Sequence, residues 1–231
     1  MSIADKVIQL KEDFDAVYAA GKASGGVDYL SLAKTVQFNS LNDFGKTEVE
    51  LNLDNCTTLY WFCRVVTENY RNTTLEHLTI NNALPTDMRG FLMCGYGERD
   101  LTLKRVTLNF DTSNVTHISN AFECMSGLEV IDGNPLDLSS VIDVLNMFNY
   151  NNALKEVRFV PNTIPLGLSF KPCPLLSNES IQSIIDGLAD LTGGTAQTLT
   201  VHQDVRNKLT TEQLDQIANK NWLISPQTST T

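Results

Sequence analysis

Hydrophobic and polar residues alternate in several short stretches of this chain, and these stretches return at a nearly constant spacing. Leu78 and Ile80 are followed 28 residues later by Val106 and Leu108. Alternation with a period of two is typical of a strand that buries one face. The same pattern occurs at three further pairs of inward positions: Leu51 and Leu53 (27 before Leu78 and Ile80), Ile131 and Gly133, and Val157 and Phe159. The pattern therefore predicts five parallel strands between about residues 47 and 176.

A stricter copy lies in the middle of the chain. The stretch NFDTSNVTHISNAFECMSGLEVI, which starts at Asn109, returns 26 residues later as PLDLSSVIDVLNMFNYNNALKEV. Phe122 then corresponds to Phe148, and Ile131 to Val157. A period of this length with apolar residues in register is typical of a solenoid, whose units bury their faces against one another. We therefore expect an α/β solenoid, with a parallel sheet on one side and the Phe-containing segments as the opposite wall.

The first 24 residues carry a different pattern, with apolar residues at alternating steps of four and three. They are Ile3, Val7, Leu10, Phe14 and Val17. This spacing predicts an amphipathic N-terminal helix over residues 1–24. Three interpretations stay open: a cap on the first strand, a contact that makes a homo-oligomer, or attachment to a larger assembly. The segment has no continuous apolar core, so we do not expect a secretory signal.

The periodicity changes again near residue 177, which predicts a C-terminal α/β cap over residues 177–231. Ser177 is placed to cap a helix whose apolar face includes Ile181, Ile184 and Ile185. The stretch TLTVH then alternates like a strand. A second helix follows, with Thr210 and Gln213 spaced as a capping box, and Trp222 is expected to cover the end of the stack.

Composition and charge narrow the class of function. The net charge of −10 and the lack of a Lys/Arg cluster argue against binding to nucleic acid. No apolar run is long enough to span a membrane. The five cysteines form no Cys-x-x-Cys pair, and none of the three histidines has an evident catalytic partner. We therefore expect no enzyme, no metal and no cofactor, with the cysteines serving as small buried residues.

The central residues resemble the leucine-rich repeats of the bacterial surface (BspA-like) type. The resemblance rests on LNFDTSNVTHISNAFECMSGLEVI (residues 108–131) and LDLSSVIDVLNMFNYNNALKEV (residues 136–157). It implies a leucine-rich repeat solenoid over residues 27–176 that serves adhesion and recognition and carries no catalytic residues. The stretch MSIADKV at the start and residues 180–222 near the end are similar to leucine-rich repeat proteins encoded by phages and prophages. That similarity implies a virion component, such as a tail or fibre part.

The outward positions of the predicted strands form a mixed polar strip, which is the candidate binding surface. Extended solenoid faces bind extended ligands, and short amides and hydroxyls suit hydrogen bonds to peptide or glycan. The alternative is a merely solvated face, on which Arg105 pairs with Asp132 and Glu156. The candidate binding residues are Glu50, Asn52, His77, Thr79, Arg105, Thr107, Asp132, Glu156 and Arg158.

Two functions remain open at this stage. The favoured one is a non-enzymatic structural and recognition protein of a bacteriophage virion, made in the host cytoplasm, whose partners are other virion proteins or a bacterial surface protein or glycan. The alternative is a bacterial leucine-rich repeat adhesin at the cell surface or outside the cell, which binds peptide or glycan.

Overall fold

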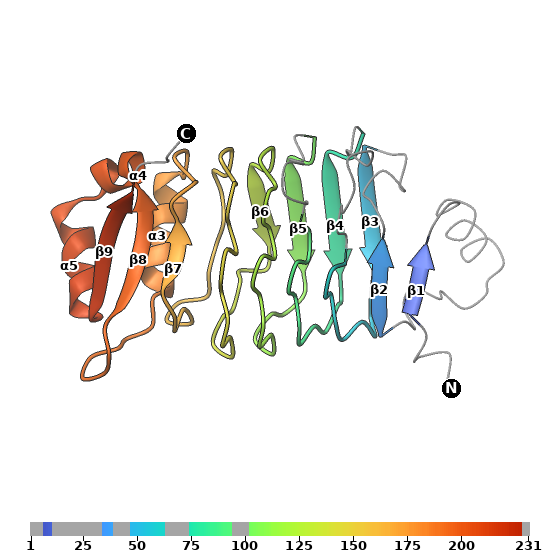
Figure 1. Ribbon diagram of the computed structural model, residues 1–231, viewed down its shortest axis with the longest axis horizontal. Coiled ribbons are helices and arrows are strands. Elements are labelled where there is room, and N and C mark those ends of the chain that lie inside the picture. The colour runs from blue at the N-terminus through green and yellow to red at the C-terminus, as the bar shows by residue number, and fades with distance from the viewer. Residues whose placement is uncertain (1–6, 11–33, 39–46, 63–73, 94–101, 228–231) are drawn as a thin grey trace.

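The computed structural model describes residues 7–10, 34–38, 47–62, 74–93 and 102–227. Parallel strands form three sheets in these residues, with the orders β1-β2, β3-β4-β5-β6 and β7-β8-β9. Three described helices, α3, α4 and α5, all lie near the C-terminal end (Figure 1). The protein thus has α/β character, with parallel sheets and helices. The strands are β1 (Val7–Leu10), β2 (Thr35–Phe38), β3 (Glu48–Asn52), β4 (His77–Asn81), β5 (Arg105–Asn109), β6 (Val130–Gly133), β7 (Leu168–Phe170), β8 (Gln197–His202) and β9 (Trp222–Gln227).

The N-terminal segment differs from its prediction. Val7–Leu10 form strand β1, which pairs in parallel with β2, so the helix expected over residues 1–24 is wrong at these four positions. Val7 and Ile8 are β-branched and favour extended backbone, and β2 supplies the main-chain partners that a strand needs. The other positions of that predicted helix lie outside the described residues.

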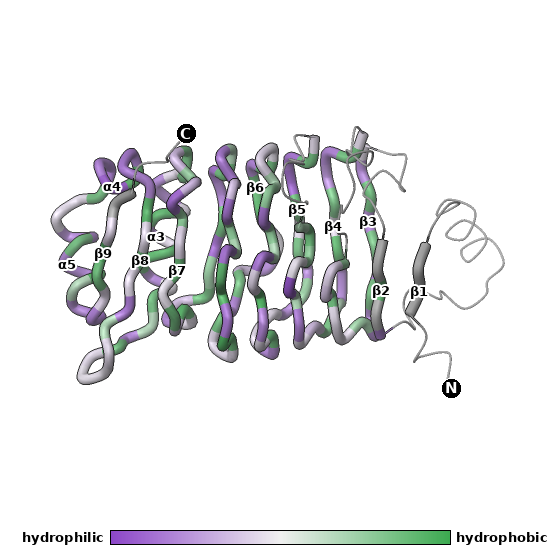
Figure 2. The backbone as a smooth tube through the Cα atoms, viewed as in Figure 1, coloured by the Kyte–Doolittle hydropathy of each residue, from purple (hydrophilic) through white to green (hydrophobic). Residues whose placement is uncertain are grey.

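The four-stranded sheet confirms the alternation seen in the sequence. In β4 and β5 the inward residues, Leu78, Ile80, Val106 and Leu108, are buried, while the residues between them are not. Figure 2 colours the same strands by hydropathy. The strand-to-strand register pairs Leu78 with Val106 and Ile80 with Leu108, as the spacing of 28 predicts. The apolar side of each strand faces the core, and the other side forms a polar surface.

The register expected for the first strand is wrong by two residues. Val49 pairs with Leu78 and Leu51 with Ile80, an offset of 29 instead of 27. Because side chains alternate with a period of two, this shift leaves Leu51 inward and Glu50 outward. The fifth predicted strand is also shorter than expected. Residues 156–159 contribute only isolated bridges, Glu156 to Val130 and Phe159 to Leu136.

A column of phenylalanine rings fills the core behind the four-stranded sheet. Phe62, Phe91, Phe122, Phe148 and Phe170 are fully buried. Neighbouring rings in this phenylalanine column lie 4.7 to 5.9 Å apart between centroids. Such spacing is typical of favourable aromatic pairs. The Phe-containing segments therefore form a wall opposite the sheet, as the sequence predicts, and this wall is called the rear wall below.

The C-terminal elements confirm most of the predicted cap. Helix α3 (Asn178–Gly187) begins after Ser177, whose hydroxyl accepts the Ser180 N–H at 3.1 Å. Helix α5 (Thr211–Asn219) begins with the expected capping box of Thr210 and Gln213. Strand β8 matches the predicted strand. The sequence did not predict α4 (Gln203–Lys208) or β9.

Trp222 and Lys220 connect the C-terminal elements through hydrogen bonds. Trp222, expected only as a cover for the stack, starts β9, is 3% exposed, and donates its indole N–H to the Ala189 carbonyl at 2.9 Å. The Lys220 ammonium lies 2.7 to 3.2 Å from the carbonyl oxygens of Ile185, Asp186 and Leu188. A cation there is favoured by the negative end of the helix dipole, and it adds to the N–H groups of Leu188 and Asn162 that already bind the Ile185 and Asp186 carbonyls.

Candidate functional site

The predicted binding residues on strands β3 to β6 do lie together on the outward side of the sheet, called the front face below. The corrected register places Glu50 beside Thr79 and Asn52 beside Asn81. His77 lies beside Arg105, and Thr107 beside Asp132. Glu156 is bridged to Val130 at the sheet's edge, and Arg158 accepts the Leu136 N–H through its carbonyl. The sequence thus predicts correctly which residues point outward. The residues of β3 lie two positions away from the neighbours in β4 that the sequence predicts.

Most polar groups of the front face bind one another. His77 Nε2 lies 2.9 Å from Thr107 Oγ1, and Thr107 Oγ1 donates to Asp132 at 2.6 Å. Arg105 also forms an ion pair with Asp132, as expected. Since both side chains are substantially exposed, this pair adds little stability. Next to it runs an amide ladder in which Asn109 donates to Asn81, and Asn81 to Glu50, each at 2.8 Å.

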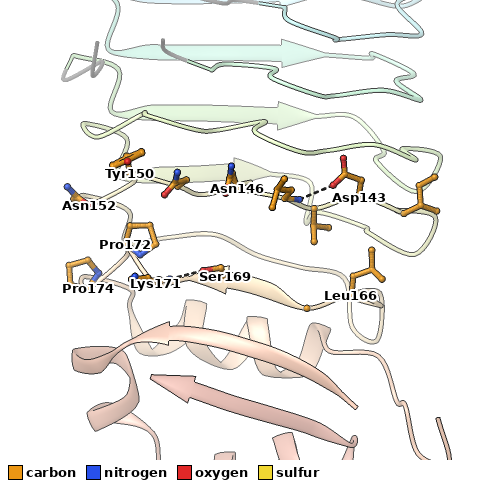
Figure 3. A pocket seen from close by; sticks show the side chains of 14 residues that line it. Asp143, Asn146, Tyr150, Asn152, Leu166, Ser169, Lys171, Pro172 and Pro174 are labelled. Atoms are coloured by element: carbon orange, nitrogen blue, oxygen red, sulfur yellow. Dashed lines mark hydrogen bonds between the residues drawn. The ribbon is translucent and has the colours of Figure 1, made fainter. Parts of the chain in front are cut away.

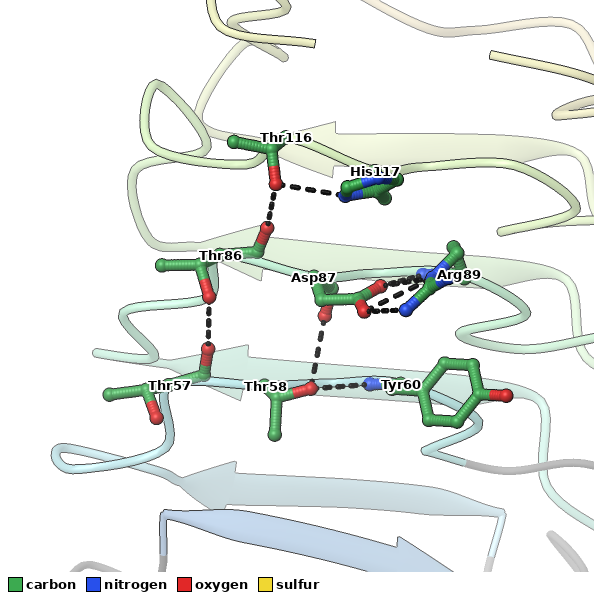
Figure 4. A network of polar contacts seen from close by, with 8 residues as sticks. All are labelled: Thr57, Thr58, Tyr60, Thr86, Asp87, Arg89, Thr116 and His117. Carbon is green, nitrogen blue, oxygen red and sulfur yellow. Dashed lines mark hydrogen bonds and ion pairs between the residues drawn. The ribbon is translucent and has the colours of Figure 1, made fainter. Parts of the chain in front are cut away.

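The rear wall carries a second polar network, which the sequence analysis did not propose as a site. Thr116 donates its hydroxyl to the Thr86 carbonyl at 3.1 Å, and Thr86 to the Thr57 carbonyl at 3.2 Å (Figure 4). These bonds join segments that are parallel and side by side. Beside them Asp87 and Arg89 form an ion pair at 2.5 Å. Burial opposes ionisation of Asp87, yet the Arg89 hydrogen bonds and charge outweigh it and lower the Asp87 pKa.

Two aromatic residues continue this surface. Tyr60 and Trp61 stack with ring centroids 4.7 Å apart, and the Arg89 guanidinium lies 4.9 Å from the centre of the Tyr60 ring. Trp61 has a φ of 48°, which is uncommon for a large side chain. The indole lies against Gly90, where an added Cβ would come within 2.3 Å of it. Gly90 therefore makes room for the Trp61 ring.

A pocket of about 830 Å³ lies farther along the rear wall. One side is formed by residues 142–152 and the other by residues 166–174 (Figure 3). Ile142 and Leu145 are strongly exposed, 68% and 66%, and line it together with polar side chains. The core continues beneath, because the rings of Phe148 and Phe170 stack at 4.7 Å.

The hydrophobic pattern alone did not predict this pocket, although two residues that line it break the 26-residue repeat. Ile142 and Leu145 stand 26 positions after Thr116 and Ser119, so the strict copy changes from hydroxyl to exposed aliphatic side chains there. Large exposed apolar residues that occur together mark interaction sites more often than isolated ones do. The pocket is therefore a candidate ligand site besides the front face.

The residues that most often carry catalysis are engaged in the structure or buried. His117 lies 3.0 Å from the Thr116 hydroxyl, and His202 caps α4 by accepting the Asp204 N–H at 3.1 Å. Burial raises the pKa of the Cys56 thiol to about 11 and that of Cys173 still further. Such thiols form little thiolate near neutral pH. Cys124 is also buried, and it is in no disulfide with the described residues.

Metal and membrane features can be judged for the described residues alone. Across residues 7–10, 34–38, 47–62, 74–93 and 102–227, no three His, Cys, Asp or Glu side chains come together as metal ligands. Within the same ranges, no helix is both long enough and apolar enough for a membrane crossing.

Comparison with protein-family models, curated proteins and solved structures finds no match for this chain.

Proposed function

We propose that the protein is a leucine-rich-repeat-type solenoid and acts as a non-enzymatic recognition protein. The observation that carries this proposal is the front face, where four parallel strands present aligned outward rows of polar side chains. The offsets of 25 to 29 residues between paired strands support the same unit size as the repeat in the sequence. Extended faces of this kind suit extended ligands such as proteins or glycans.

The proposed setting is a bacteriophage virion, where the chain would belong to a tail or fibre and contact other virion proteins or the host surface. Support comes from the resemblance of both ends of the chain to phage and prophage proteins. The exposed aliphatic pair Ile142 and Leu145 agrees with a surface that meets a partner. The alternative is a bacterial adhesin at the cell surface, which the same faces would serve.

Mass spectrometry of purified particles tests the virion proposal. Particles would be collected from a lysate of the encoding strain or phage and separated from soluble protein on a density gradient. Peptides of this chain should band with the particles in constant ratio to a known tail protein. Peptides confined to soluble fractions would refute the virion proposal, and peptides released by protease from intact, uninduced cells would favour the adhesin instead.

The oligomer proposed for residues 1–24 needs its own test, since Val7–Leu10 are a strand. Sedimentation of the full chain and of a chain lacking residues 1–24 separates the alternatives. A full chain that is monomeric throughout would remove oligomerisation from the proposal.

A further inference from the structure

We propose that the pocket between residues 142–152 and 166–174 binds an extended peptide segment of a partner as an additional parallel strand. The inference deepens the proposed recognition function and rests on it. Its starting point is an interruption in the hydrogen bonding of the rear wall. Successive rear-wall segments are joined by main-chain bonds up to the segment that begins near Ile142, and within the described ranges no main-chain hydrogen bond joins that segment to residues 166–174.

The bonding before the interruption is regular. The N–H groups of Ile118, Asn120 and Phe122 donate to the carbonyls of Asp143, Leu145 and Met147, at 2.8 to 3.1 Å. Twenty-six residues later, the corresponding donors are Val144, Asn146 and Phe148. Among the described residues, these three N–H groups have no hydrogen-bond acceptor. Val144 and Asn146 both line the pocket, so the segment offers two such donors, two residues apart, beside it.

The opposite side of the pocket explains why the neighbouring segment does not accept these N–H groups. Strand β7 forms its main-chain hydrogen bonds with β8 instead, with Leu168 beside Leu199 and Phe170 beside Val201. Pro172 and Pro174 follow at once, and proline has no N–H to extend a ladder. An unpaired row of this kind is the arrangement to which extended peptides add a strand.

The spacing and direction of the walls define the ligand. Carbonyl groups of an extended peptide point to one side at every second residue, which matches the donors of Val144 and Asn146. The match ends there, because residues 145–150 form turns and φ is 56° at Asn146. Both walls run the same way, from Asp143 and Leu166 at one end to Tyr150 and Lys171 at the other (Figure 3). The bound strand is therefore parallel to both, with its N-terminal side near Asp143.

Charge completes the description of the ligand. The Asp143 carboxylate accepts the Leu145 N–H with one oxygen, and its charge also acts on Arg89, although Asp143 has no ion-pair partner at contact distance among the described residues. Lys171, at the opposite end, likewise has none in that part of the chain. The preferred peptide carries a basic residue toward its N-terminal side and an acidic residue toward its C-terminal side. Its apolar residues contact Ile142 and Leu145. A glycan fits less well, because regularly spaced N–H donors match a peptide backbone.

A phage-displayed library of random dodecapeptides provides the probe, with the full-length chain as bait. Enriched peptides should share a basic residue before an acidic one, separated by an extended apolar stretch. Their affinity for Ser169→Tyr, which fills the pocket from exposed Ser169, should fall at least tenfold. The matched control is Thr211→Tyr, which adds a similar bulk at an exposed position of α5, outside both the pocket and the front face, and should leave the affinity unchanged. Thr107→Tyr tests the front face separately.

A second variant guards against a misfolded Ser169→Tyr. Lys171→Glu should weaken peptides with an acidic C-terminal side about tenfold and favour the same peptides with a basic residue there. Binding that Thr107→Tyr abolishes and Ser169→Tyr spares would overturn the pocket proposal while leaving the recognition function standing. A library without enrichment would overturn it too, as would a glycan array whose signal Ser169→Tyr removes while no peptide binds.

Discussion

Phe122 occupies the middle of the phenylalanine column, so its truncation tests whether this column holds the molecule together. The Phe122 ring is fully buried and lies between Phe91, at 5.9 Å in an edge-to-face arrangement, and Phe148, at 5.8 Å in a stacked one. Replacing it by alanine removes both ring contacts and leaves a cavity between two segments. The Phe122→Leu variant keeps most of the buried volume and serves as the control.

The expected magnitude follows from burial and from the two neighbours. Truncating a buried Phe to Ala costs about 3 to 5 kcal/mol, and a fully enclosed site with ring partners on both sides belongs in the middle of that range or above it. Phe122→Leu keeps an apolar group in the same space and should cost about 1.5 kcal/mol. For a chain of this size, the difference of about 2.5 kcal/mol corresponds to roughly 5 to 10 °C in Tm.

Hydrogen exchange followed by mass spectrometry locates the effect as well as its size. In Phe122→Ala, amides of β4, β5 and β6 should exchange about 10² to 10³ times faster than in the unmodified chain, because each tenfold step equals about 1.4 kcal/mol. Amides of β8 and α5 should change much less if segments depend mainly on their neighbours. Equal losses at both ends would refute that dependence, and equal Tm values for the Ala and Leu variants would refute the column as the main packing element.

Three further predictions concern single positions. Gly133→Ala should lower the free energy of unfolding by about 2 to 3 kcal/mol in urea, because φ is +87° and the new Cβ would come within 2.5 Å of the Leu108 carbonyl oxygen; an unchanged midpoint would contradict this. Lys220→Met should cost about 2 kcal/mol, more than the control Lys208→Met, whose ammonium meets one carbonyl at 2.9 Å; equal urea midpoints would refute the cap. Cys173 should resist iodoacetamide at pH 7.5 until denaturant is added, because burial raises its pKa, and mass spectrometry of alkylated peptides would expose early labelling.

The sequence predicts strands best where the alternation is long. The spacing from Leu78 to Val106 gives the correct register, whereas the offset from Leu51 is misjudged by two, and the strict copy that starts at Asn109 reaches neither pair. The face of each strand is still correct, since a shift of two preserves inward and outward positions. At Val7–Leu10 the apolar spacing fits a helix equally well, and pairing with β2 decides for a strand.

The pocket could not be predicted in the same way, because it depends on a choice of pairing partner. Leu168–Phe170 has the composition of a strand that fits beside residues 142–152, and only the three-dimensional structure shows that it pairs with β8. Local periodicity contains no information on which of two neighbours a short strand selects. The changes from Thr116 to Ile142 and from Ser119 to Leu145 at the 26-residue shift are the local signs of this pocket in the sequence.

The front face and the pocket should also differ in how they gain binding energy. A ligand on the front face must replace bonds that already exist, such as those of Thr107 with Asp132 and Asn109 with Asn81. Its net gain per hydrogen bond is therefore small, and substitutions there should alter specificity more than affinity. In the pocket, a peptide carbonyl meets main-chain donors that lack protein acceptors, beside apolar Ile142 and Leu145 that it would remove from water. If both surfaces act in recognition, most of the affinity should come from the pocket.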